Sequence, residues 1–432
     1  MKTIPKYLLA LTFLLLSFAG NAASILMPMD EIQKEHLKAY GIAYWILKNG
    51  ETVDWLLNYR GGSFMAKYNK NLEDECKIRG VSYEVLPDAK VAQINAEIAD
   101  PSANMELVKL EKLPRVALYS PPTKGPLEDA VLLVLKYAEI PFDMIYDEEV
   151  LKGDLSKYDW LHLHHEDFTG QYSKFGRGGY SEMGSFNQRD REIQEARAKK
   201  LGYGKVSKMK LAVAQTIRSF TAGGGFLFAM CSGADSFDIA LSAANTDIVD
   251  EQYDGDGIDP KAQSKLDYSQ TVAFQNFLIP TDSYSNMKFS DIDVRGGGRG
   301  GGRGGGRGDM STDFFTLFDF SAKWDVVPSM LTQNHDKVVK GFIGLATAFN
   351  KNRLKPGVVI MGERKVGDEA RYIHGEFGKG QWTFYGGHDP EDYQHGPNDP
   401  LTDLRLHPNS PGYRLILNNV LFPAAKKKHQ KT

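Results

Sequence analysis

The chain contains few cysteines: only Cys76 and Cys231 occur in 432 residues. This excludes a scaffold built on a disulfide framework, because such proteins are small and rich in cysteine. A chain of this length can bury a large core and does not need a covalent cross-link. The two cysteines could still pair in an oxidising compartment, and Cys231 would then not be free to act as a nucleophile.

An excess of charge of one sign is also absent. The formal net charge is -3, so no global field favours nucleic acid or a membrane surface as a partner. The basic residues in the C-terminal stretch 423–432 are typical of a solvated tail. We therefore expect a small molecule, a sugar or a peptide as the partner, and no nucleic acid.

Long apolar runs are missing after the first 22 residues, so no membrane span is expected in the mature chain. The N-terminus itself has Lys2 and Lys6, then an apolar run from residue 8 to 19, then small residues. This three-part layout is that of a secretory signal peptide. We predict cleavage after Ala22 and a periplasmic or secreted protein; the alternative, a membrane anchor, is disfavoured because the apolar run is short.

Two α/β segments follow the expected signal peptide. In residues 23–105, short strand patterns surround one long helical pattern, which predicts a small N-terminal α/β unit. In residues 113–422, continuous apolar runs alternate with helical patterns, which is typical of a doubly wound, mostly parallel sheet. A large insertion, about residues 244–350, interrupts this second segment. Its Arg-Gly tract, residues 294–310, cannot bury apolar area and is predicted to be a disordered surface loop.

The stretch "GGGFLFAMCSGADSF" predicts a nucleophile at Cys231. An apolar strand ends at this cysteine, and small residues after it permit a tight turn into a helix. The helix N-terminus would lower the pKa of the thiol, and amides near Ser232 and Gly233 could receive an oxyanion. The alternative is a buried core cysteine, since free cysteine is among the most buried residue types.

A thiolate needs a base, and "WTFYGGHDPEDY" supplies His388 at the end of another apolar strand. Asp389 and Glu391 lie close enough in sequence for one of them to orient the imidazole, which would complete a Cys-His-acid set. The alternative is a loop histidine beside acidic turn residues.

A third signal is "LHLHHEDF", which closes another predicted strand. Its polar end should face the same edge of the sheet. His164, His165 and Glu166 are candidates for substrate contact or support of the oxyanion. The spacing matches no familiar metal motif, so neither a metal site nor a cofactor is predicted.

The cysteine stretch resembles the nucleophile elbow of class I glutamine amidotransferase-like proteins, and "GKGQWTFYGGHDPED" is similar to the histidine strand of one of their branches. The resemblance covers about residues 113–422 and implies a flavodoxin-like sheet with a Cys-His-acid triad that hydrolyses an amide. Cys231 would be the nucleophile and His388 the base. Amidotransferases usually carry His-x-Glu, which would place the acid at Pro390; here it must come from Asp389 or Glu391.

The whole chain also resembles exported bacterial proteins labelled asparagine synthetase B. Its residues do not support that chemistry. Such a synthetase exposes a cysteine directly after Met1, where this chain has Lys2, and "SGADS" is one residue short of the pyrophosphate loop. Two hypotheses of different class therefore remain: an exported cysteine-dependent amide hydrolase, and a non-catalytic sugar- or peptide-binding protein on the same fold.

Overall fold

A computed structural model describes the chain in stretches separated by short gaps: residues 22–122, 129–164, 166–171, 181–280, 289–294, 314–325, 331–332, 336–340, 348–364, 369–391 and 400–425. Residues 1–21 of the expected signal peptide, His165 and residues 295–310 of the Arg-Gly tract lie outside these ranges, whereas Ala22, the last residue of that peptide, is described as the first residue of a strand. The chain divides into two compact units. The first comprises Met1–Leu113, Phe320–His335 and Ala424–Thr432, and the second Pro114–Asp319 and Asp336–Pro423.

The first unit has an antiparallel sheet in the order β4-β1-β3-β2-β5. Its strands are β1 (Ala22–Met27), β2 (Val53–Leu57), β3 (Ser63–Lys67), β4 (Glu84–Pro87) and β5 (Glu106–Leu110). The helices are α2 (His36–Lys48), α3 (Lys70–Arg79) and α4 (Asp88–Ala99). Cys76 lies fully buried on α3, and burial raises the pKa of its thiol to about 12.

The second unit is built on a mixed sheet whose described strands run in the order β11-β10-β13-β14-β15-β9-β8-β6-β7. The last five of these are parallel to one another, and the others pair antiparallel. The parallel strands are β6 (Val116–Tyr119), β7 (Asp143–Ile145), β8 (Trp160–Leu163), β9 (Phe226–Met230) and β15 (Gly380–Tyr385). The antiparallel strands are β10 (Phe314–Leu317), β11 (Val338–Lys340), β12 (Phe349–Asn350), β13 (Val359–Arg364) and β14 (Glu369–Phe377). The expectation of an α/β protein with a largely parallel central sheet is confirmed.

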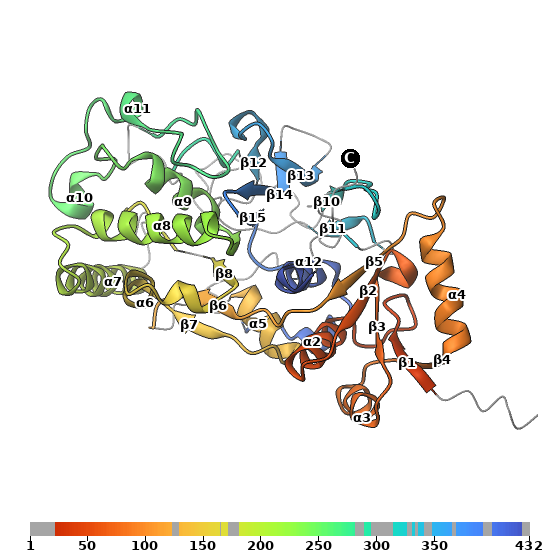
Figure 1. Cartoon of the computed structure of the whole chain (residues 1–432). Coiled ribbons are helices and arrows are strands. Elements are labelled where there is room, and N and C mark those ends of the chain that lie inside the picture. Colours follow the sequence, from red (N-terminus) through yellow and green to blue (C-terminus); the bar gives the residue numbers. More distant parts are fainter. Residues whose placement is uncertain are drawn as a thin grey trace, which may run out of the picture. The chain divides into compact units, whose positions relative to one another are not determined.

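Helices lie on both faces of this sheet (Figure 1). The described helices of this unit are α5 (Ala130–Tyr137), α6 (Asp147–Leu151), α7 (Ser181–Lys200), α8 (Val206–Ala222), α9 (Ser232–Ser242), α10 (Glu251–Asp254), α11 (Ala262–Lys265) and α12 (Pro411–Leu421), of which α10 and α11 are single turns away from the strands. Because both faces are covered, β9 reads as an uninterrupted apolar run and every one of its residues is buried.

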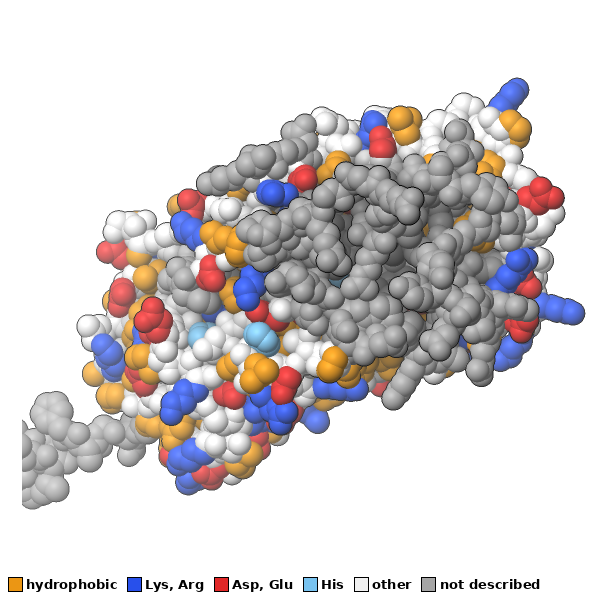
Figure 2. Space-filling model, turned by 180° about the vertical axis from the view of Figure 1, so that it is seen from behind, with side chains coloured by type: hydrophobic (Ala, Val, Ile, Leu, Met, Phe, Trp, Pro, Cys, Tyr) orange, Lys and Arg blue, Asp and Glu red, His pale blue; other side chains and the backbone are white. Residues whose placement is uncertain are grey.

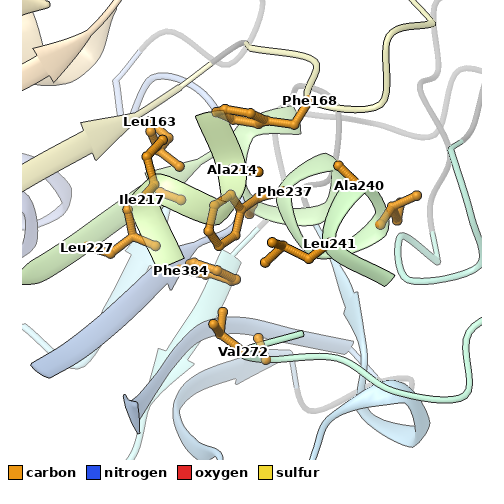
Figure 3. Close-up of a cluster of buried hydrophobic side chains, with 14 of the residues drawn as sticks. Leu163, Phe168, Ala214, Ile217, Leu227, Phe237, Ala240, Leu241, Val272 and Phe384 are labelled. Carbon is orange, nitrogen blue, oxygen red and sulfur yellow. The ribbon is translucent and has the colours of Figure 1, made fainter. Parts of the chain in front are cut away.

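The core of the second unit forms where α8 and α9 pack on the sheet (Figure 3). Ala214 and Ile217 of α8 and Phe237 of α9 meet Leu227 of β9 and Phe384 of β15, all fully buried. This packing fixes the start of α9 against the end of β9, which is where the candidate nucleophile lies.

No helix among the described residues combines the length and the apolar character needed to cross a membrane. On the face that Figure 2 shows, the described Lys and Arg side chains are interspersed with Asp and Glu. The described part of that face therefore carries no extended region of one charge.

Candidate active site at the carboxyl ends of the parallel strands

Parallel pairing brings three of the predicted residues to one edge of the sheet. Leu163 of β8 pairs with Ala229 of β9, and Met230 of β9 pairs with Tyr385 of β15. The chain therefore leaves the sheet at the same edge just before His164, Cys231 and His388. In open α/β sheets this edge is where ligands bind.

Cys231 has a backbone conformation that is rare for a residue with a side chain. Its φ is 50° and its ψ is -140°, and it forms the N-cap of α9. Non-glycine residues avoid this region, and they persist there only when the surrounding structure imposes it. Its N–H donates a hydrogen bond to the Gly387 carbonyl oxygen at 3.1 Å, which ties the elbow to the residue before His388. Both cysteines are free thiols, so the alternative of a disulfide is not observed.

Gly233 is held closely against the end of β8. Its N–H donates to the His164 carbonyl oxygen at 2.6 Å, and a Cβ at this position would lie 2.6 Å from that same oxygen. Only glycine fits this approach. The Gly233 amide is thus engaged with His164, which argues against Gly233 as an oxyanion donor; Ser232, the other residue expected there, is buried.

His388 is buried and lies beside a second histidine. Its ring centroid is 4.8 Å from that of His164. Burial lowers the pKa of His164, against the opposing charges of Asp129 and Asp389. The backbone of the elbow is therefore bonded to the segments after β8 and β15, whose two imidazoles lie beside each other.

The two candidate acids have different surroundings. Asp389 is fully buried, and its carboxylate accepts hydrogen bonds from the Tyr413 hydroxyl at 2.7 Å and the Glu391 amide at 2.8 Å. The Glu391 carboxylate lies 3.1 Å from Lys340 Nζ and 3.3 Å from His407 Nδ1. Glu391 is thus committed to two basic side chains, whereas Asp389 is close enough to His164 to affect its pKa.

Glu166 belongs to a buried ionic network rather than to an open surface. Its carboxylate accepts from the Tyr146 hydroxyl at 2.8 Å and lies 3.6 Å from Lys210 Nζ. Its carbonyl oxygen accepts from the Ser236 hydroxyl at 2.9 Å, which links β8 to α9. These contacts place Glu166 in a structural network near the start of α9, and substrate contact by Glu166 stays a prediction.

Sequence reasoning missed Asp129, whose carboxylate lies near both His162 of β8 and His164 directly after that strand. Asp129 Oδ1 lies 3.4 Å from His162 Nε2 and 3.5 Å from His164 Nδ1. The same oxygen caps α5, accepting from the amides of Val131 and Leu132. Although burial raises the pKa of Asp129, the charges of His162 and His164 lower it well below its usual range. The only sequence signal was an aspartate before an apolar helical run, which is an ordinary N-cap.

A second group of acids, Asp247, Asp254 and Asp256, also lies close together. Lys205 already occupies its centre: Nζ lies 3.0 Å from Asp247 and 3.2 Å from Asp254, and it also contacts Asp256. The Lys205 ammonium is therefore already a cation shared by the three carboxylates, and this group carries no proposal of a metal site.

No protein-family model and no curated protein matches the chain. Among solved structures, two described as cytoplasmic proteins from Salmonella typhimurium match with TM-scores of 0.34 and 0.36 and identities of 12% and 13%. The first match covers 73% of this chain and the second 72%, and both cover 100% of the Salmonella chain. A beta-galactosidase from Bacillus circulans sp. alkalophilus matches at a TM-score of 0.26 and 13% identity, over 65% of this chain and 30% of that enzyme. At these TM-scores the similarities establish neither a shared fold nor a function.

Proposed function

We propose that the chain is an exported, glutamine amidotransferase-like enzyme in which Cys231 attacks an amide carbonyl and His388 moves the proton. The observation that carries this proposal is the strained backbone of Cys231, with φ 50° and ψ -140°, between β9 and α9. Strained strand-to-helix turns present nucleophiles in α/β hydrolases. A buried cysteine with a purely packing role would gain nothing from this conformation.

The strand order supports the fold that the proposal needs. Counted along the chain, the parallel strands β7-β6-β8-β9-β15 have the order 2-1-3-4-5, which is the flavodoxin-like order. In such sheets ligands bind at the carboxyl edge, where Cys231 and His388 follow neighbouring strands. We therefore propose a flavodoxin-like, doubly wound sheet as the scaffold of the enzyme.

The proposed reaction proceeds in two acyl transfers. His388 takes the proton of the Cys231 thiol, the sulfur bonds to the amide carbon, and the carbonyl oxygen becomes an oxyanion near the Ser232 amide. The C–N bond then breaks, and the imidazolium gives its proton to the departing amine. Water, deprotonated by His388, splits the thioester and releases the acid. Asp389, buried next to the histidine pair, is the proposed carboxylate of the set.

The second candidate is a binding protein for a sugar or peptide on the same fold. The observation that favours it over the enzyme is the burial of Cys231, which is 1% exposed and thus gives a substrate carbonyl little access to the sulfur. Asparagine synthetase is the third and weakest candidate. Its pyrophosphate contact needs a loop, whereas Ser232–Ser236 form the first turn and a half of α9.

Hydrolysis of small amides tests the proposal. A panel that includes glutamine, asparagine and N-acyl amino sugars is incubated with the purified protein, and the released amine is measured. Replacing Cys231 by alanine should lower kcat/KM for any amide that is turned over by at least about 10³-fold, because the nucleophile is lost. Cys76→Ser is the matched control, since Cys76 is equally buried but lies in the other unit. Turnover that survives Cys231→Ala would contradict the proposal.

A further inference from the structure

The side chains of Asp129, His162 and His164 form a buried cluster that the proposed reaction does not use. One nitrogen of each imidazole and one carboxylate oxygen lie within 4.8 Å of one another. His162 is fully buried and His164 2% exposed, while the Asp129 side chain is 18% exposed. Two imidazoles and a carboxylate are the ligand types that zinc takes in catalytic sites, which keep a fourth position for water.

Hydrogen bonding determines which nitrogen of His162 faces the carboxylate. His162 Nδ1 lies 3.2 Å from the Phe228 carbonyl oxygen. A carbonyl oxygen only accepts, so Nδ1 carries the proton. Nε2 then faces Asp129 Oδ1 with its lone pair, unless it binds a second proton. A histidine that donates Nδ1–H to a backbone carbonyl and presents Nε2 is the arrangement found in metal sites, where this bond fixes the ring orientation.

The separations fit a shared ion better than direct hydrogen bonds. The two N···O distances, 3.4 Å and 3.5 Å, exceed the length of about 2.7–2.9 Å that is usual between a charged donor and a carboxylate. A tetrahedral zinc ion with bonds of about 2.0–2.1 Å has ligand atoms about 3.4 Å apart. The α5 amides hold the carboxylate in place through Oδ1, and the acceptor positions that remain, about two of roughly four, are those of Oδ2.

We propose that Asp129, His162 and His164 bind a divalent transition-metal ion of the zinc class. The ion neutralises the carboxylate that faces two imidazole nitrogens, and it holds the His164 ring against His388 at the observed centroid distance of 4.8 Å. The proposal does not depend on the amidase reaction, because it rests on three side chains that take no part in the proposed acyl transfer.

Metal binding by the full-length mature protein, prepared without a polyhistidine tag and stripped with a chelator, tests the site. Zn²⁺ is titrated by calorimetry, and Co²⁺ reports tetrahedral coordination by its visible absorption. The variants are Asp129→Asn, which keeps the helix cap because asparagine caps as well as aspartate, and His162→Gln. The matched control is His374→Gln: this histidine is also buried in the sheet, but its Nδ1 lies 3.0 Å from the Thr383 hydroxyl and away from the cluster.

Wild type and His374→Gln are expected to bind one Zn²⁺ with equal affinity. Loss of an outer-shell partner alone weakens metal binding 10- to 100-fold, so loss of a ligand should weaken it by at least about 100-fold in both cluster variants. Circular dichroism shows whether each variant folds. If His162→Gln does not fold, the affinity of Asp129→Asn alone is compared with that of wild type. No zinc binding by wild type would overturn the proposal. Zinc binding that both cluster variants retain would overturn it as well.

Discussion

Replacing Lys210 by methionine is expected to lower the free energy of unfolding by about 3–5 kcal/mol. Lys210 is 2% exposed on α8, and its Nζ donates to the hydroxyls of Tyr119 and Tyr146, each at 2.9 Å, and to Asp147 at 3.0 Å. Burial alone would lower the pKa of Lys210, but the charges of Asp147, Tyr146 and Glu166 raise it above the usual range. The ammonium therefore stays charged, and its loss leaves Asp147 buried with Arg197 3.8 Å away as its remaining cation.

Urea unfolding of three variants measures this effect. Lys200→Met is the matched control, because the pair of Lys200 and Glu148 is exposed and should contribute at most about 1 kcal/mol. The double variant Lys210→Met with Asp147→Leu should recover much of the loss, since an apolar pair leaves no uncompensated charge. A Lys210→Met protein as stable as Lys200→Met would show that the network does not stabilise this edge of the sheet.

Glycine at position 231 is expected to give a more stable protein than alanine, by up to about 2 kcal/mol once the usual cost of glycine is subtracted from the relieved strain. This reverses the usual order, in which glycine within regular structure costs about 0.5–1 kcal/mol relative to alanine. The reason is the φ of 50° and ψ of -140° at Cys231, a conformation that costs a residue with a Cβ about 1–3 kcal/mol. Thermal and urea unfolding of Cys231→Gly and Cys231→Ala measure the difference.

Ala240→Gly is the internal control for this comparison. Ala240 lies within the same helix, α9. The Ala240→Gly protein should therefore have a free energy of unfolding about 1 kcal/mol lower than wild type. If Cys231→Gly were also less stable than Cys231→Ala, the backbone at position 231 would not be strained. The strained conformation could then no longer support Cys231 as the nucleophile.

The composition of the site at the sheet edge was largely predictable, because strand ends are visible in the sequence. Apolar runs that stop before His164, Cys231 and His388 predict their common edge once the strands are taken as parallel. The partners of these residues were not predictable. Asp129 precedes His162 by more than thirty residues and looks like any helix cap, and it meets the histidines only because β6 and β8 are neighbours.

Other residues also differ from what the sequence predicted, because they contact residues that are distant in the sequence. Glu391 is close to His388 in sequence, yet its carboxylate contacts Lys340, which belongs to the predicted insertion. Asp30 precedes the first long helical pattern as a cap would, but α2 begins at His36, and the Asp30 carboxylate binds Arg60 at 2.6 Å. Lys210 occupies what looks like a polar position of an amphipathic helix. Its buried ion pair with Asp147, which lies on another helix, cannot be predicted from that pattern.

The pKa of the Cys231 thiol shows whether Cys231 is a nucleophile activated by His388 or a buried core cysteine. It is obtained from the pH dependence of alkylation by iodoacetamide in the Cys76→Ser background, with His388→Ala and His374→Ala beside it. Cys76 adds little in this range even when present, because burial raises its pKa to about 12. The account predicts a pKa well below the usual value of about 8.5, raised by His388→Ala and unchanged by His374→Ala. Two results would contradict activation by His388. The thiol could fail to react, or its pKa could be ordinary or higher and unchanged by His388→Ala.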